Sequence, residues 1–366
     1  MGLALRLAKK GLGRTSPNPV VGAVVVKNGR VIGSGYHRKA GLEHAEIKAL
    51  IEAGKNARGS TVYVTLEPCS HFGRTPPCTE TIIKSGVKRV VSAMKDPNRL
   101  NNGKGFEKLR RAGIKVLGGV LEDEARNLNE IFIKYITTKR PFVIAKVAQS
   151  IDGKIATKTG RSKWISGEES RRYVHKLRGR VDAVMVGLRA VLKDNPLLTS
   201  RSGGVNGRQP VKIIVDSKLR TPLKSRIFSR DKTGRVIIAT TTKAPEKRIG
   251  KFEKMGAEVL VLAEKNGLVD LKELLGELGK REITSVLVEG GGELIGSLVD
   301  EKLIDKFLFF IAPKIIGGRS AVTSVEGEGF SSVEEALVLN NLTYKRIGKD
   351  FLIEGYLNAQ RTTHNA

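Results

Sequence analysis

Short strand patterns alternate with helical patterns along almost the whole chain, and this alternation limits the possible fold more than any other feature. It predicts mostly parallel sheets with helices packed on their faces, because parallel strands need a crossover between them. A polar stretch that ends in Pro141 interrupts the alternation at residues 137–141. We therefore expect an α/β protein with two domains, residues 1–138 and 139–366, as a chain of 366 residues allows.

The first series of patterns predicts a compact α/β/α domain. Asn28-Gly29 lies between two apolar runs, which is a typical signal of a two-residue β-hairpin turn. The expected helices are residues 3–8, 45–53, 79–85, 106–112 and 122–135, and the expected strands are 20–26, 31–32, 61–65, 89–93 and 114–117. Glycines directly after two of these helices, Gly54 and Gly86, support where the helices end.

The second series predicts a mostly parallel sheet with helices on both faces. The expected strands are residues 142–148, 183–187, 211–215, 236–240, 259–262 and 285–288, with helices at 169–178, before Gly256 and at 268–278. Three later strand patterns, at residues 306–311, 343–346 and 351–356, are expected to add edge strands.

Three consecutive glycines, in Glu289-Gly-Gly-Gly292, lie between the strand at 285–288 and an expected helix. Glycines let a ligand approach the backbone, and the first turn of a helix offers free N–H groups to a pyrophosphate. The standard GxGxxG dinucleotide fingerprint is absent after the first strand of this series. The motif therefore predicts a nucleotide contact or, equally well, a plain turn between strand and helix.

One histidine and two cysteines have the types and positions of zinc ligands. His44 begins one expected helix, Cys69 follows a strand, and Cys78 begins another helix. One imidazole and two thiolates leave the fourth position of Zn²⁺ open for water, as a catalytic site requires. Glu46 follows His44 by two residues and could carry a proton from that water to a leaving nitrogen. The alternative is that these are unrelated core residues, which the order of the full set makes less plausible.

The motifs of the first half resemble the bifunctional deaminase–reductase family of riboflavin biosynthesis. They are Thr15-Ser-Pro-Asn-Pro-Val-Val-Gly22, Gly35-Tyr-His37, His44-Ala-Glu46 and Thr65-Leu-Glu-Pro-Cys-Ser-His-Phe-Gly-Arg-Thr-Pro-Pro-Cys78. Eight residues separate the two cysteines, whereas the deaminases of nucleosides, tRNA and polynucleotides have two in H-x-E…P-C-x-x-C.

This resemblance implies a cytidine-deaminase-like domain in which Zn²⁺ is bound by His44, Cys69 and Cys78 and Glu46 is catalytic. A diamino-hydroxy-pyrimidine ribosylamine phosphate would lose its ring amino group to water there. The implied substrate contacts are Asn18, His37, His71 and Arg74. Arg74 could instead be a solvated loop charge.

The resemblance extends over the second half through Lys146-Val-Ala-Gln-Ser-Ile-Asp-Gly153, Ser162-Lys-Trp-Ile165, Leu192-Lys-Asp-Asn-Pro196 and the triple glycine. It implies a reductase domain similar in fold to dihydrofolate reductase, which transfers hydride from NADPH to the sugar C1 of a phosphoribosylamino-uracil and gives the ribityl product. The implied NADPH contacts are Ala148, Trp164, Ala190, Asp194, Gly291, Gly292, Glu293, Leu294, Ile295, Gly296 and Ser297. The substrate contacts are Lys146, Ser162, Arg178, Leu198, Arg201 and Glu289.

Four of these positions leave alternatives open. Trp164 could be a core residue, and Ala190 stands where the family often has a hydroxyl residue, so that its contact could be missing. Lys146 and Glu289 both lie at strand ends where either could supply the proton for the sugar ring oxygen.

The charge of the chain is strongly positive, with 65 Lys+Arg against 37 Asp+Glu and a net charge of +28. Such an excess suits nucleic acid or phosphate-bearing small molecules. A deaminase of tRNA or another polynucleotide is therefore an alternative. Such an enzyme would have a C-x-x-C pair and no nucleotide-binding second half, and the chain shows neither feature. A nucleic-acid-binding protein with a structural zinc is another, but it needs a fourth ligand, and the chain has only two cysteines.

The expected partners are small phosphoribosyl pyrimidines, with no nucleic acid and no membrane, and the resemblance implies a homo-oligomer. No apolar run approaches the roughly 18 residues of a membrane-spanning helix. Two free cysteines and a start without a secretory signal pattern favour the reducing cytoplasm.

Overall fold

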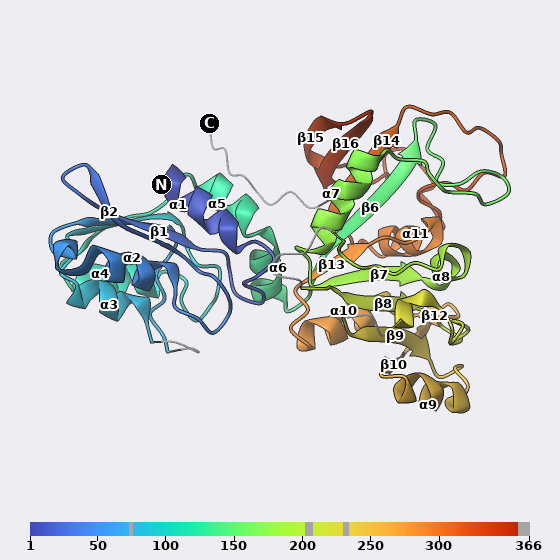
Figure 1. Ribbon diagram of the computed structural model, residues 1–366, viewed down its shortest axis with the longest axis horizontal. Helices are drawn as coiled ribbons and strands as arrows, with labels where there is room; N and C mark the ends of the chain where they lie inside the picture. Colours follow the sequence, from blue (N-terminus) through green and yellow to red (C-terminus); the bar gives the residue numbers. More distant parts are fainter. Residues whose placement is uncertain (73–75, 202–207, 230–233, 358–366) are drawn as a thin grey trace. The chain divides into compact units, whose positions relative to one another are not determined.

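The computed structural model describes residues 1–72, 76–201, 208–229 and 234–357. It divides into two compact units, Met1–Lys139 and Arg140–Ala366, one residue beyond the expected boundary. Each unit is built on a sheet of its own, and helices pack against both sheets (Figure 1). The predicted α/β fold class is confirmed.

The first unit contains a five-stranded sheet of order β2-β1-β3-β4-β5. Its strands are β1 (Gly22–Lys27), β2 (Arg30–Tyr36), β3 (Thr61–Leu66), β4 (Arg89–Met94) and β5 (Lys115–Leu117). β1 is antiparallel to β2 and β3, whereas β3, β4 and β5 are parallel. The φ angles of Asn28 and Gly29, 49° and 74°, confirm the predicted hairpin turn.

Helices cover both faces of this sheet. They are α1 (Gly2–Ala8), α2 (Ala45–Ala53), α3 (Cys78–Lys84), α4 (Lys104–Arg111), α5 (Glu122–Leu128) and α6 (Glu130–Thr138). A Cβ on Gly22 would overlap the carbonyl oxygen of Ala4 in α1, and one on Gly35 would overlap that of Ala45 in α2. Gly35 pairs with Ala23, the neighbour of Gly22, so the two glycines face opposite sides of the sheet. They allow α1 and α2 to pack directly on the strand backbones.

The prediction of one helix over residues 122–135 is wrong, because Asn129 separates α5 from α6. Asn129 is buried, and its Oδ1 accepts a hydrogen bond of 2.9 Å from the Val20 amide. Its Nδ2 donates one of 3.1 Å to the Val20 carbonyl. An asparagine side chain that bonds to a distant backbone in this way competes with the helical pattern. The break therefore results from a tertiary contact over 109 positions.

The second unit contains a nine-stranded sheet of order β10-β9-β8-β7-β13-β6-β14-β16-β15. The strands are β6 (Phe142–Ser150), β7 (Ala183–Gly187), β8 (Val211–Val215), β9 (Val236–Thr241), β10 (Glu258–Leu262), β13 (Ser285–Val288), β14 (Lys306–Ala312), β15 (Asn340–Ile347) and β16 (Asp350–Tyr356). Neighbours from β10 to β14 are parallel, and β16 and β15 continue the sheet antiparallel. Of the three strands expected at the edge, only β15 lies there, because β14 is between β6 and β16, and β16 is between β14 and β15.

The helices of the second unit are α7 (Glu168–Arg178), α8 (Leu188–Asp194), α9 (Glu246–Lys254), α10 (Leu271–Lys280) and α11 (Gly292–Asp300). α10 begins later than predicted, because Asp270 accepts a hydrogen bond of 2.9 Å from the Glu273 amide and caps it. Leu268–Val269 forms the short strand β12 instead, paired with β11 (Glu264–Lys265). The carboxyl ends of the parallel strands meet at one edge of the sheet, which brings the loops after β6, β7, β8 and β13 together.

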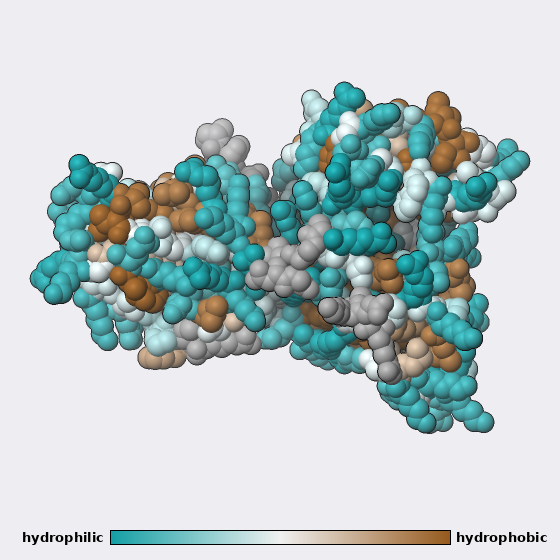
Figure 2. Space-filling view, in the orientation of Figure 1, coloured by the Kyte–Doolittle hydropathy of each residue, from teal (hydrophilic) through white to brown (hydrophobic). Residues whose placement is uncertain are grey.

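The surface shown in Figure 2 is predominantly hydrophilic, and its hydrophobic areas are small and separate. Among the residues that the structure describes, every helix is too short or too polar to cross a lipid bilayer.

Candidate functional site

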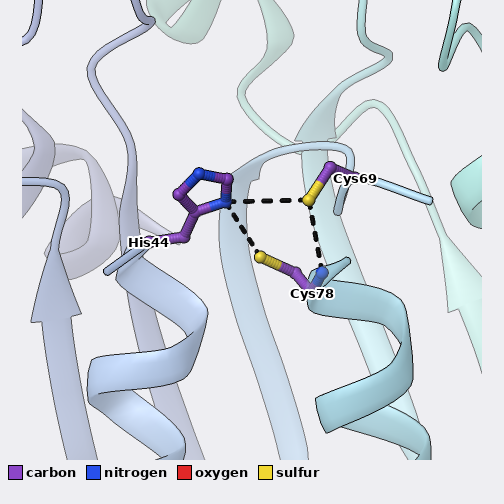
Figure 3. Close-up of side chains that lie close together, drawn as sticks. All are labelled: His44, Cys69 and Cys78. Carbon is purple, nitrogen blue, oxygen red and sulfur yellow. Dashed lines mark hydrogen bonds between the residues drawn. The ribbon is translucent and has the colours of Figure 1, made fainter. Parts of the chain in front are cut away.

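The starts of α2 and α3 bring the three expected zinc ligands together in the first unit (Figure 3). His44 caps α2, Cys78 is the first residue of α3, and Cys69 lies in the loop after β3. The Nδ1 atom of His44 is 3.0 Å from Cys78 Sγ and 3.6 Å from Cys69 Sγ, and the Cys78 amide donates to Cys69 Sγ at 3.2 Å. Within the described part of the chain, this is the one group of three or more His, Cys, Asp or Glu side chains that converges closely enough to hold a metal ion.

The three ligand atoms fit a zinc ion. Nitrogen and sulfur ligands of a tetrahedral Zn²⁺ lie about 3.5 Å apart, close to the distances observed here. A hydrogen bond from the Cys78 thiol lowers the pKa of Cys69 to about 4, and the same bond, together with burial, raises the pKa of Cys78. One thiolate is therefore present before any metal binds, which favours a cation at this place.

Glu46 lies beside these ligands in the first turn of α2 and is 3 % exposed. Burial raises its pKa, against the effect of the nearby His44, and its carboxyl contacts Cys78. A carboxyl with a raised pKa can accept and release a proton near neutral pH. Its position suits the proton transfer expected of it.

Two of the four expected substrate residues of this unit contact each other. Asn18 Nδ2 is 3.2 Å from His37 Nε2, and His37 Nδ1 is 3.2 Å from the Glu43 carbonyl oxygen. The ring of His37 meets that of His44 edge to face at 5.3 Å. The Nδ1 atom of His71 is buried and has no hydrogen-bond partner within the described residues. Arg74 lies outside the described residues.

A cavity of about 1850 Å³ lies at the carboxyl ends of the parallel strands in the second unit. All six expected substrate residues line it, and so do all expected NADPH residues except Gly296. Trp164 belongs to its wall and is 63 % exposed, with the Arg171 guanidinium 4.5 Å from its ring centroid, so it is not a core residue. Ser162 donates a hydrogen bond of 3.2 Å to Asp194, which joins an expected substrate residue to an expected cofactor residue.

The glycines at the start of α11 differ in what they face. Nothing lies within 4 Å of the place where a Cβ on Gly291 would be, so a ligand can approach the backbone there. A Cβ on Gly292 would be 2.7 Å from Glu326 Cγ, and one on Gly296 would overlap the Glu326 carbonyl. Gly291 therefore suits a pyrophosphate at the start of the helix, whereas Gly296 allows residues 323–327 to pack on α11.

Glu289, Arg178 and Lys146 form an ionic cluster in the cavity wall. The Glu289 carboxylate is 2.6 and 2.9 Å from Arg178 Nε and Nη2, and 3.4 Å from Lys146 Nζ. Burial would raise the pKa of Glu289, but the charges of Arg178 and Lys146 prevail and lower it to about 2. At neutral pH Glu289 is ionised and has no proton to donate.

The sequence reasoning missed two residues that hold the sites in place. Asn129 fixes Val20, next to the loop that carries Asn18. The sequence signal for this residue is an asparagine inside a helical pattern. His175 lines the cavity, with Nδ1 3.1 Å from the Thr199 carbonyl oxygen. Its spacing of three from Arg178 places both on one face of α7, and that spacing could have found it.

Comparisons with known proteins match both units. The family model of the cytidine and deoxycytidylate deaminase zinc-binding region matches residues 1–94. The family model of the RibD C-terminal domain matches residues 141–353. The riboflavin biosynthesis protein RibD of Aquifex aeolicus (strain VF5) is 48% identical over 353 residues, which covers 96% of this chain and 96% of that protein.

Two solved structures are similar over 97% of this chain and 97% of their own. The structure of Acinetobacter baumannii RibD, form 1, is 38% identical, with a TM-score of 0.87. The diaminohydroxyphosphoribosylaminopyrimidine deaminase/5-amino-6-(5-phosphoribosylamino)uracil reductase of Thermotoga maritima is 42% identical, with a TM-score of 0.83.

Proposed function

The chain belongs to the RibD family of riboflavin biosynthesis proteins, and on that premise we propose which of its residues act in each of the two reactions. It is a bifunctional enzyme, a zinc-dependent deaminase and an NADPH-dependent reductase. The alternative of a tRNA or polynucleotide deaminase is not favoured, because the relatives are similar over the whole chain, the reductase half included.

For the deaminase, we assign His44, Cys69 and Cys78 as the zinc ligands. A zinc ion held by these three residues would supply a water activated as a nucleophile near neutral pH. Glu46 accepts the proton of that water at its carboxylate and delivers it to the ring amino group, which leaves as ammonia. The substrate is a diaminohydroxyphosphoribosylaminopyrimidine, which Asn18, His37, His71 and Arg74 bind and orient.

For the reductase, we propose that Gly291 at the start of α11 would hold the pyrophosphate of NADPH, which would supply the hydride for the sugar C1 of 5-amino-6-(5-phosphoribosylamino)uracil. Because Glu289 is ionised, we assign Lys146 as the donor of the proton that the sugar ring oxygen takes up as the ring opens. Arg178 donates three of its five N–H groups to Glu289 and Thr199, so two remain for the substrate. Ser162, Leu198 and Arg201 complete the substrate site.

The observation that carries this function is the convergence of His44, Cys69 and Cys78 beside the buried Glu46. Purified protein should be incubated with the diamino-pyrimidine substrate, with and without NADPH, and the products identified by mass. We expect the deaminated uracil without NADPH and its ribityl form with NADPH. If neither product forms, the proposal is wrong.

We also propose that the enzyme works in the cytoplasm as a homo-oligomer with small-molecule partners and no nucleic acid. Cys69 and Cys78 are free, as zinc ligands must be, and a reducing compartment keeps them so. The edge strand β15 exposes 60 % of Leu342 and 83 % of Tyr344, a surface that a second copy would cover. Light scattering after gel filtration tests the assembly, and the mass of a single chain would contradict it.

A further inference from the structure

A short segment of the reductase unit, residues 198–201, is fixed against the last turn of α7. Leu198, Thr199 and Ser200 are almost completely buried, whereas Arg201 is exposed to the cavity that it lines. The segment carries two of the proposed substrate contacts, Leu198 and Arg201, one at each end. Its backbone position therefore determines where both of them meet the substrate.

Polar side chains hold this backbone from two sides. The Thr199 carbonyl accepts hydrogen bonds from His175 Nδ1 and from Arg178 Nη1, both at 3.1 Å. Ser200 Oγ donates to the His175 carbonyl at 3.0 Å. On the other side, Gln209 accepts from the Ser200 amide at 2.8 Å and donates to the Ser200 carbonyl at 3.1 Å.

His175 supplies its hydrogen bond as a neutral ring. Burial and the charges of Arg178 and Arg201 lower its pKa, so the ring carries one proton at neutral pH. Nδ1 lies 3.1 Å from the Thr199 oxygen, which can only accept, and the Arg201 amide N–H points to the same Nδ1 atom at 3.4 Å. With its proton on Nδ1 the ring donates the shorter of these two bonds, and with its proton on Nε2 it accepts the longer one, so either neutral tautomer ties the ring to residues 199–201. A donor without charge can lie between two guanidinium groups and not repel either.

We propose that His175 is a positioning residue of the reductase, which acts through the Thr199 carbonyl to place Arg201 at the phosphate of the substrate. The inference rests on the proposed function, since it needs a phosphorylated substrate in this cavity. Arg201 suits that role, because its guanidinium forms no ion pair with any residue that the structure describes. A free guanidinium at a cavity wall is a strong phosphate ligand.

The test compares three variants in the complete protein. His175→Ala removes the donor, His175→Asn keeps an N–H donor near the position of Nδ1, and Lys176→Ala changes the exposed neighbour on α7 as a control. For His175→Ala we expect the KM for the uracil substrate to rise about tenfold with kcat within about threefold, because the phosphate does not react. The dissociation constant of NADPH, measured by fluorescence, should not change. The other two variants should resemble the parent.

Two further variants separate positioning from a general loss of structure. His175→Ala combined with Arg201→Ala should have the same KM as Arg201→Ala alone, because there is no guanidinium left to place. Ser200→Ala removes the hydrogen bond from Ser200 Oγ to the His175 carbonyl and should raise KM a few-fold. This variant keeps the test available if His175→Ala does not fold.

The inference is overturned if KM is unchanged in both His175→Ala and Ser200→Ala, or if the increases in KM add up in the double variant. It is also overturned if His175→Ala binds NADPH more weakly, or if His175→Asn does not restore the KM of the parent. A parent protein with no reductase activity would instead overturn the proposed function.

Discussion

The carboxylate of Glu289 accepts two hydrogen bonds from the guanidinium of Arg178, although 111 positions separate the two residues. The contact joins the end of β13 to the last turn of α7, and Lys146 on β6 adds a second cation at 3.4 Å. Three elements of the reductase unit therefore meet at one buried carboxylate. Its ionisation is linked to the stability of the unit.

Glu289 should make the protein sensitive to acid. Its pKa falls from the ordinary 4.5 to about 2 on folding, so its contribution to stability is complete above about pH 4.5 and is lost as the pH falls towards 2. The shift corresponds to on the order of 3 kcal/mol. Glu289→Gln should be less stable at pH 7 and should lose less stability between pH 5 and pH 3, as measured by denaturant unfolding. The same pH dependence in both proteins would contradict the prediction.

We predict about one zinc per chain. Cys78→Ser should lose the metal and the deaminase activity, while the reductase activity survives, because all three ligands lie in the first unit. His71→Ala serves as the control, since this histidine lies outside the ligand cluster and should keep the zinc. Metal content is measured by atomic emission. Full zinc occupancy in Cys78→Ser would refute the ligand assignment.

Glu46→Gln should keep zinc and lose almost all deamination. The amide has the same size but cannot carry a proton, and general acid–base catalysis contributes roughly 10²–10⁴-fold in rate. Glu43→Gln is the matched control. Glu43 lies three residues before Glu46, and its exposed carboxylate pairs with Lys48. Initial rates of ammonia release measure the effect. If Glu46→Gln runs within a few-fold of the parent, Glu46 has no role in proton transfer.

Residues 140–366 expressed alone should fold and reduce the uracil substrate. This part has its own sheet and its own core of buried apolar side chains, among them Leu274, Leu278 and Leu298. Circular dichroism and the oxidation of NADPH measure folding and activity. Insoluble or inactive protein would mean that the reductase needs the first unit.

NADPH should be preferred over NADH by at least about tenfold in kcat/KM, or roughly 1.4 kcal/mol. Lys218 follows β8 and Lys243 follows β9, so both belong to loops at the carboxyl ends of parallel strands, where donors for the extra phosphate are expected. Lys218 lines the cavity after β8, whereas Lys243 is 2.7 Å from Glu264 and does not line it. Lys218→Ala should therefore narrow the preference, and Lys243→Ala should leave it unchanged. Equal use of both nucleotides by the parent would show that the preference does not exist.

Most elements could be predicted because their signals are local. The Asn28-Gly29 turn, the start of α2 at Ala45 and the strand β3 all follow from side-chain periodicity and turn residues within a few positions. Two of the errors occur where a distant group intervenes: Asn129 binds Val20 and breaks a helix, and further strands cover β14 and β16. The late start of α10 has a local cause, the cap by Asp270.

The sequence by itself determined the α/β class and a set of zinc ligands whose types and order are chemically specific. Only the tertiary structure decided that Gly291 faces the cavity while Gly296 faces Glu326, that Lys218 and not Lys243 is open to a ligand, and that Glu289 is ionised. Each of these depends on the distance to a group on another element, and neither periodicity nor spacing along the chain contains that distance. The direction of a side chain and its charge state are set by neighbours that only folding brings together.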